Sequence, residues 1–260
     1  MVASLPFKMR EKTSYSRKRY AALPLVGITN MNEYSIEIVD NHIICLMDEK
    51  RVLLDTGAPN SISDGSSLSV LGNNHSFSRS FMGFSIDELS RLVGTEINIL
   101  LGGDVLKNLN FFVDWDRKTL LFSSTAIEHK GARVPLDFFR NIPIVLLYVD
   151  GTNLRAFLDT GAKLSYLNPD LTAGHNLLGR TSDFYPGIGQ FDTDIYEVPV
   201  MLANHTFTVI AGHLPTLLQM PLMMANTQGI LGNDIFKYFN VCFNFQVKEL
   251  ILVKRNGNAA

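Results

Sequence analysis

The sequence predicts an all-β protein with minor helix, and three observations predict it. Short apolar or alternating runs, separated by polar turns, recur along the chain, as in Tyr34–Val39 and Ile142–Val149. The second observation is an internal repeat that covers most of the 260 residues. The third is composition, because 46% hydrophobic and only 18% charged residues supply core for two packed units.

The strands expected from this pattern fall in the same order in both halves of the chain. In the first half they are Tyr34–Val39, Ile43–Met47, Val52–Leu54, and a hairpin of Phe111–Trp115 and Leu120–Phe122. In the second half they are Ile142–Val149, Ala156–Leu158, Val198–Leu202, Thr206–Ile210, Val241–Phe245 and Leu250–Val253. Ser123–Gly131 is polar and unpatterned, which is typical of a linker.

Helices are expected in only a few short segments. Ser85–Leu92 predicts one or two helical turns, and Val105–Leu109 and Ile235–Phe239 predict a short helix in each half. Asp104 and Asp234 stand directly before these two helices, where an N-cap is wanted.

The repeat is defined by two motifs that occur in the same order in each half. Asp55-Thr56-Gly57-Ala58 recurs 104 positions later as Asp159-Thr160-Gly161-Ala162, each time after an apolar run. Leu100-Leu101-Gly102 recurs 130 positions later as Ile230-Leu231-Gly232. The second copy therefore contains 26 extra residues, between Ser165 and about Val198. Repeats of this length indicate two similar units, not a solenoid.

These paired motifs resemble the pepsin/retropepsin group of aspartic peptidases, over essentially residues 30–255. In that family each lobe supplies one Asp-Thr/Ser-Gly turn and a later apolar-apolar-Gly segment beside it. The resemblance implies a two-lobed acid-protease fold, with two retropepsin-like β-barrel lobes related by pseudo-two-fold symmetry. It divides the chain into an N-terminal lobe at 23–128 and a C-terminal lobe at 132–256.

Asp55 and Asp159 are the expected catalytic pair. Two carboxyl groups a hydrogen bond apart cannot both ionise, so they share a proton and can act as acid and base. The expected active-site turns are Thr56, Gly57 and Ala58 in one copy and Thr160, Gly161 and Ala162 in the other. By resemblance, the two threonine hydroxyls cross between the lobes and hold the turns together. A simpler alternative is that both aspartates only form turns.

Ala58 and Ala162 occupy positions where pepsins usually have a hydroxyl residue. They cannot add the hydrogen bond that Ser provides there. We therefore expect a pair less acidic than that of pepsin, and activity at mildly acidic or neutral pH.

The 26 extra residues predict a flap, the β-hairpin that closes over substrate in this family. They contain a Gly-rich tip between aromatic flanks. The expected substrate-binding residues of this flap are Phe184, Tyr185, Gly187, Ile188 and Gly189. Because the first copy lacks the segment, one flap is expected, from the C-terminal lobe; in pepsins it comes from the N-terminal lobe. Core packing of the aromatic residues is the alternative.

Composition and motifs exclude several classes of binding partner and cofactor. A net charge of −2 gives no drive toward nucleic acid or anionic membrane, and no apolar run is long enough to insert in a membrane. No His or Cys spacing indicates zinc, so no metal or cofactor is expected. Cys45 and Cys242 lie in apolar runs and are expected to be reduced core residues.

Residues 1–22 are basic and predict a flexible leader, with a removable pro-segment or docking arm as alternatives. No apolar stretch follows the basic residues, so no secretory signal is expected, and the localisation predicted is cytoplasmic.

The predicted function is that of an aspartic endopeptidase that cuts extended peptides with apolar residues near the cut. It would work as a monomer, since both aspartates belong to one chain. The alternative is a catalytically silent, retropepsin-like module that binds a peptide or protein. A glycosidase that uses the two carboxylates is a third, remote alternative.

Overall fold

The computed structural model describes residues 30–81, 83–185 and 189–255. Strands make up 54% of the described residues and helices 14%, which confirms the all-β class with minor helix. Residues 1–29, 82, 186–188 and 256–260 lie outside the described residues, so the structure says nothing of the predicted leader.

The first half of the described chain, residues 30–123, forms eleven strands and two helices. Their bounds are β1 (Met31–Val39), β2 (His42–Met47), β3 (Lys50–Leu54), β4 (Ile62–Ser63), β5 (Ser67–Val70), β6 (Asn73–Ser76), β7 (Ser80–Phe81), β8 (Phe84–Ser85), α1 (Ile86–Val93), β9 (Ile99–Leu101), α2 (Gly103–Leu106), β10 (Asn110–Asp114) and β11 (Thr119–Ser123).

The second half, residues 132–254, forms another eleven strands, one α-helix and three 3₁₀ helices within the described ranges. Their bounds are β12 (Ala132–Pro135), β13 (Asp137–Phe139), β14 (Ile142–Val149), β15 (Thr152–Leu158), β16 (Ser165–Leu167), η1 (Pro169–Leu171), β17 (Asn176–Tyr185), β18 (Gly189–Leu202), β19 (His205–Gly212), α3 (Thr216–Met224), β20 (Gly229–Leu231), η2 (Asn233–Lys237), β21 (Phe239–Asn244), η3 (Phe245–Val247) and β22 (Glu249–Lys254).

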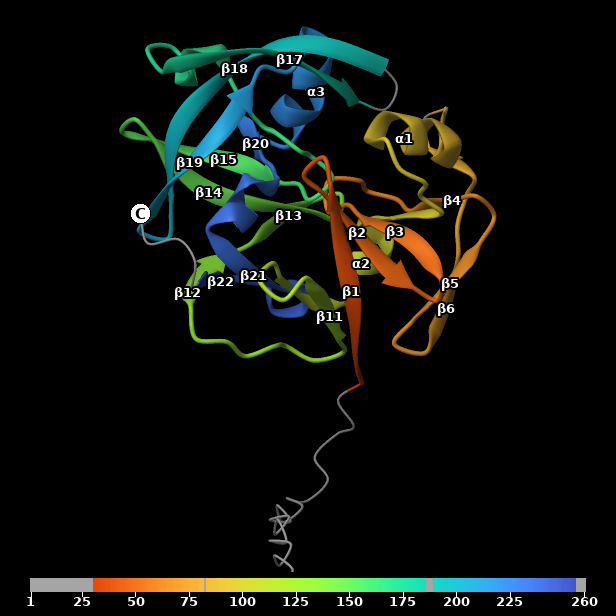
Figure 1. The fold of residues 1–260 in the computed structure, drawn as a ribbon. Helices are drawn as coiled ribbons and strands as arrows, with labels where there is room; N and C mark the ends of the chain where they lie inside the picture. The colour runs from red at the N-terminus through yellow and green to blue at the C-terminus, as the bar shows by residue number, and fades with distance from the viewer. Residues whose placement is uncertain (1–29, 82, 186–188, 256–260) are drawn as a thin grey trace, which may run out of the picture.

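The two halves meet in one sheet, at the pair β10–β21. The strand order there is β12-β22-β21-β10-β11-β1, and β10 and β21 run antiparallel with Phe111 opposite Phe243. These two rings stack with centroids 4.4 Å apart, and both side chains are fully buried. The hairpins β10–β11 and β21–β22 are those predicted from the sequence, and one core cluster runs through both halves. The chain therefore folds around a shared centre (Figure 1).

Each half repeats the same strand pairings on its own side of that centre. β2–β3 and β14–β15 are antiparallel hairpins, and β3–β9 and β15–β20 are parallel pairs. β4 and β16 then pair antiparallel with β9 and β20. A parallel pair inside a mostly antiparallel sheet brings the end of the strand before each Asp-Thr-Gly turn beside the Leu-Gly segment.

Two-residue turns fix the register of these hairpins. Asp40 and Asn41 link β1 to β2 with φ values of 44° and 65°. Arg140 and Asn141 link β13 to β14 with φ values of 49° and 70°. Positive φ at both positions matches the right-handed twist of the paired strands, and Asn tolerates it well.

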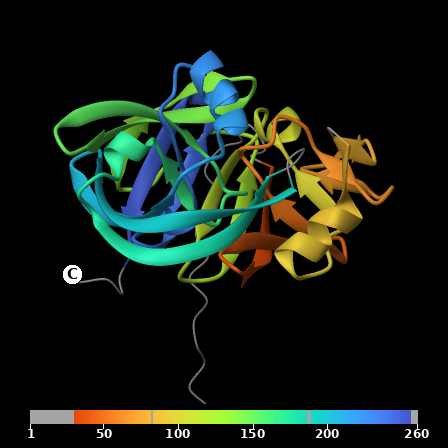
Figure 2. The ribbon, with the colours of Figure 1, turned by 90° about the horizontal axis from the view of Figure 1, so that it is seen from above.

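The 26 extra residues of the second copy form most of a long hairpin, β17–β18, at the edge of an eight-stranded sheet. It extends from the second half toward the first half and ends near α1 (Figure 1, Figure 2). The first half has only the short pair β5–β6 in the corresponding place.

The predicted helix at Ser85–Leu92 is present as α1, and the predicted linker forms no strand or helix in residues 124–131. The predicted N-caps are wrong. α2 begins at Gly103 and η2 at Asn233, each capped by the preceding glycine without a side-chain hydrogen bond. Asp104 accepts hydrogen bonds from the N–H and hydroxyl of Ser61, because the nearby turn leaves those donors facing it.

Asp234 also has another partner in place of a cap. It accepts a hydrogen bond from the Ile210 N–H at 2.6 Å and pairs with Lys237. Cys45 and Cys242 are buried free thiols, as predicted. No helix in the described ranges is long and apolar enough to cross a membrane.

Candidate active site

Both Asp-Thr-Gly turns are positioned by the parallel strand pairs. β3 and β15 end directly before Asp55 and Asp159, and the N–H groups of these aspartates donate to the carbonyls of Leu101 and Leu231 at 3.0 and 2.9 Å. The Leu-Gly segments thus support the turns from one side, in both halves and with the same geometry.

Threonine hydroxyls join the two turns across the centre of the molecule. Thr56 Oγ1 donates to the Leu158 carbonyl at 2.7 Å and accepts from the Thr160 N–H at 3.0 Å. Thr160 Oγ1 donates to the Leu54 carbonyl at 2.8 Å and accepts from the Thr56 N–H at 3.0 Å. Both threonines are buried, so these four bonds fix the separation of the two turns without competition from water.

The glycines of the turns allow the two aspartates to meet. A Cβ on Gly57 would lie 2.1 Å from the carboxyl carbon of Asp159. A Cβ on Gly161 would lie 2.4 Å from that of Asp55. Each glycine therefore leaves the space that the opposite carboxyl group occupies.

Asp55 and Asp159 are half-buried residues, and their carboxyl groups lie within hydrogen-bonding reach of each other. Asp55 Oδ1 accepts the N–H groups of Gly57 and Ala58 at 2.9 and 2.8 Å, and Asp159 Oδ1 accepts the Gly161 N–H at 2.8 Å. Burial raises the pKa of both aspartates above the ordinary 3.8, and the neighbouring carboxylate raises the pKa of Asp55 further. The raised pKa values favour retention of a proton by the pair at pH values where isolated aspartates are ionised.

A serine behind each turn was missed by the sequence analysis. Ser61 and Ser165 stand six residues after the two aspartates, and each accepts the N–H of the glycine in the Leu-Gly segment, Gly102 or Gly232, at 2.8 and 3.1 Å. Both serines are buried. Their equal spacing from the repeated aspartate was the signal that could have found them.

The hairpin β17–β18 brings its two aromatic residues to different halves of the molecule. Phe184 packs against an apolar cluster of the first half and stacks between Phe84 and His42, with centroids 6.4 and 6.3 Å away. Tyr185 packs in a cluster of the second half that includes Ala162. Gly189 pairs with Tyr185 across the hairpin, while Gly187 and Ile188 lie outside the described residues.

Tyr185 lies close enough to the aspartate pair for the two carboxylates to affect the pKa of its hydroxyl group. Burial, then the carboxylates of Asp159 and Asp55, raise the pKa of Tyr185 to about 12. Its hydroxyl therefore stays protonated at physiological pH and can donate a hydrogen bond. The preceding strand is anchored by Asp183, which is buried and accepts a hydrogen bond from the Tyr166 hydroxyl.

His42 is a second residue that the sequence analysis missed. It is buried under Phe184, and no partner is present for its Nδ1. Burial lowers its pKa below 6.5, against the opposing effect of Asp40 and Asp183. Burial under the hairpin therefore favours the neutral form of this imidazole. No sequence signal identified it, because its environment comes from a strand more than 140 residues away.

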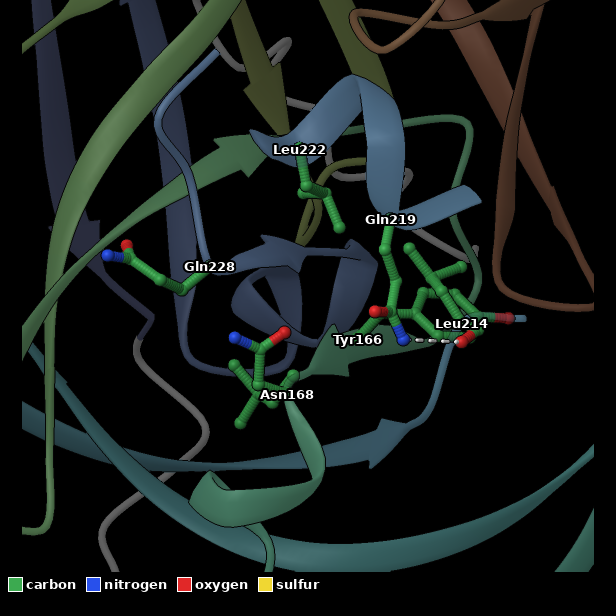
Figure 3. A pocket seen from close by; sticks show the side chains of 7 residues that line it. Tyr166, Asn168, Leu214, Gln219, Leu222 and Gln228 are labelled. Carbon is green, nitrogen blue, oxygen red and sulfur yellow. Dashed lines mark hydrogen bonds between the residues drawn. The ribbon is translucent and has the colours of Figure 1, made fainter. Parts of the chain in front are cut away.

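Two further features complete the surroundings. A small hollow lies under α3 in the second half, with Tyr166, Leu214, Leu222 and the side-chain amides of Gln219 and Gln228 around it (Figure 3). No group of three His, Cys, Asp or Glu residues that could hold a metal ion occurs in the described part of the chain.

Comparison with known proteins gives little beyond this geometry. No family model and no curated protein sequence matches the chain. Among solved structures, 312 chains match, one of them the foamy viral protease-reverse transcriptase in complex with RNA/DNA hybrid. It is 14% identical with a TM-score of 0.28, and the match covers 42% of this chain and only 12% of the viral one. A similarity at this level supports no statement about the site.

Proposed function

We propose that the protein is an aspartic endopeptidase with Asp55 and Asp159 as its catalytic pair. One observation supports this most directly: two half-buried aspartates have their carboxyl groups within hydrogen-bonding reach, and four crossed bonds of buried threonines join their turns. A turn-forming aspartate has no need of a second carboxylate beside it. Like charges brought together raise the free energy of the folded state, so such a pair indicates a chemical role.

In this proposal the two halves are retropepsin-like lobes, at residues 23–128 and 132–256, related by a pseudo-two-fold axis between the turns. The paired hydrogen bonds of the turns and the β10–β21 pairing support it. The lobes together form one acid-protease site within a single chain, so a monomer suffices.

The chemistry follows from the shared proton. A water held between the carboxyl groups gives a proton to the ionised carboxylate while its oxygen attacks the carbonyl carbon of the peptide bond. The protonated carboxyl group gives its proton to the carbonyl oxygen, which yields a neutral tetrahedral diol. When the diol collapses, one of its hydroxyl groups gives a proton to the ionised carboxylate, the carbon–nitrogen bond breaks, and the leaving nitrogen takes the proton of the other carboxyl group.

The hairpin suggests how substrate is held. An extended peptide between the aspartates and Phe184 and Tyr185 would have one aromatic residue over each half. Apolar clusters border the site on both sides, next to Ala58 and Ala162. We therefore propose that substrates are extended peptides with bulky apolar residues around the cut, and that the flap residues close over them.

The test is cleavage of a peptide library between pH 3 and 8 by the wild-type chain and by Asp55→Asn and Asp159→Asn. In each variant kcat should fall by about 100-fold to 10,000-fold, because acid–base catalysis by the pair is removed. Asp48→Asn is the matched control, since Asp48 is an exposed turn residue. Wild-type activity should peak at mildly acidic or neutral pH.

Undiminished cleavage by both Asn variants would refute the assignment. Peptide binding by the wild-type chain without cleavage at any pH would favour the catalytically silent binding module instead.

A further inference from the structure

The outer surface of α3 is apolar and exposed. Leu217, Met220, Met223 and Met224 are 68%, 60%, 76% and 62% exposed, and their spacing places them along one side of the helix. No Asp, Glu, Lys or Arg occurs between Ala211 and Asn233. Four large apolar side chains are thus exposed on one helix, and the neighbouring sequence carries no Asp, Glu, Lys or Arg. We call these four residues the α3 face.

The other half of the molecule shows that this position does not require an apolar surface. α1 begins 130 residues before α3 and buries Leu89 and Val93 at the same spacing as Leu218 and Leu222 of α3. The exposed side chains of α1 are Asp87 and Arg91. Since an equivalent helix is stable with a charged surface, the α3 face needs an explanation other than folding.

The inner side of α3 connects the face to the candidate site. Leu218 and Leu222 pack in the same cluster as Tyr185 and Phe191 of the hairpin and Ala162 of the second turn. Leu222 and Gln219 also border the hollow beneath the helix (Figure 3). In Figure 2, α3 stands at the rim of the second half, across from the hairpin. The face is therefore the outer side of a helix whose inner side packs with residues of the candidate site.

We propose that the α3 face binds an apolar segment of the polypeptide substrate outside the stretch held between the hairpin and the aspartates. This rests on the proposed function and extends it. Methionine suits the role because its flexible, polarizable side chain adapts to ligands of different shape. Such a surface recruits unfolded or partly unfolded proteins that expose Leu, Ile, Met or Phe near a cleavable segment.

Two other occupants fit the observations less well. Binding to an anionic membrane draws on Lys and Arg beside the apolar residues, and the segment has none. A stable dimer needs about 20–30 residues from each partner, and the face supplies four.

The experiment compares two peptides that share one cleavable sequence. The short peptide has about eight residues, and the long one adds an uncharged segment rich in Leu and Met at one end, each end being tested separately. The variant is Met220→Glu with Met223→Glu. Its matched control is Leu146→Glu with Val247→Glu, which changes two apolar residues that are 57% and 58% exposed elsewhere on the surface. Met220→Gln with Met223→Gln replaces the Glu variant if its unfolding temperature falls.

The wild-type chain should cleave one long peptide with a kcat/KM about tenfold above that of the short peptide. The variant should lose this advantage and cleave the short peptide at the wild-type rate, while the control keeps both values. An unchanged ratio in the variant would overturn the proposal and leave the proposed function intact.

Binding separates the two proposals. The Asp55→Asn, Asp159→Asn double variant should bind a fluorescent long peptide, and adding the α3 substitutions should weaken that binding. If the wild-type chain cleaves no peptide but the α3 substitutions still weaken binding of the long peptide, the proposed peptidase activity is refuted. The proposal that the α3 face binds an apolar segment is then supported. A dimer, or vesicle binding, that disappears in the α3 variant would assign the face to a second copy or to lipid and overturn the proposal.

Discussion

α1 and α3 begin 130 residues apart in the two copies of the repeat, and they differ in almost every respect except what they bury. α1 has a complete capping box, in which Ser85 and Glu88 satisfy each other's N–H groups, and a charged outer surface. α3 has no side-chain cap, contains Pro221 and exposes Leu and Met. By contrast, the threonines of the two Asp-Thr-Gly turns make the same hydrogen bonds in both halves.

Position relative to the centre explains the difference. Thr56 contacts Thr160 and Gly57 contacts Asp159, so a change in either copy alters the surroundings of the other. Each peripheral helix packs mainly on its own half, where the sequence can vary without disturbing the pair. The two copies therefore have the same residues and bonds where they meet at the centre. They differ at the peripheral helices, whose surfaces are free to bind different partners.

The largest effect should come from breaking the shared centre. Thr56→Val leaves the Leu158 carbonyl and the Thr160 N–H buried without their partners, at about 1–3 kcal/mol for each group. Thr160→Val should cost the same, because its bonds are the mirror of these. Urea unfolding measures both. The double variant should cost less than the sum of the single ones, and strict additivity would show that the two turns are independent.

A smaller effect is expected at the hairpin, which only one half has. Phe184→Ala removes the ring that stacks on Phe84 and His42, so the hairpin should hold substrate less firmly and KM should rise about tenfold, or about 1.4 kcal/mol. Steady-state kinetics on a short peptide measure it. Leu177→Ala, an exposed residue on the same strand, is the control. Equal effects of the two changes would argue against a specific contact.

Removing the polar side chain at the start of the helix should affect the free energy of unfolding differently at the two helices, by about 1 kcal/mol. Ser85→Ala removes the α1 cap and should lower the free energy of unfolding by roughly that amount. Thr216→Ala at the start of α3 should have almost no effect, since no side-chain cap is present there. Thermal unfolding of both variants compares them, and a loss in Thr216→Ala as large as in Ser85→Ala would contradict the assignment.

The aspartate pair should produce a pH dependence of stability. In the unfolded chain both aspartates titrate near 3.8, and in the folded protein their pKa values are raised. Between pH 3.8 and the folded pKa values, the folded state therefore binds more protons than the unfolded chain. The stabilisation that the pair adds is complete below pH 3.8 and is lost as pH rises through the folded pKa values. Asp159→Asn removes one of the two charges, so its unfolding temperature should exceed that of the wild type at pH 7, with a smaller gain at pH 4. The same gain at both pH values would mean that the carboxyl groups are not coupled.

The sequence analysis succeeded where the information was local or repeated. Alternating runs predicted the strands, and the helical pattern at Ser85–Leu92 predicted α1. It failed at Asp104 and Asp234, because a residue before a short helix is an N-cap only if no stronger partner competes. The Ser61 N–H and hydroxyl and the Ile210 N–H were those partners, and the fold brought them from 43 and 24 residues away.

The sequence by itself determined the all-β class, the repeat and the residues that the repeat singles out, because side-chain periodicity and duplicated motifs are properties of the chain alone. Only the tertiary structure decided that the two carboxyl groups meet, that Phe184 rests on His42, and that one helix of a matched pair turns an apolar side to water. These depend on contacts between segments about 100 residues or more apart and on which side of a helix finds a neighbour. Burial, which raises or lowers each pKa in the site, exists only once those segments have packed.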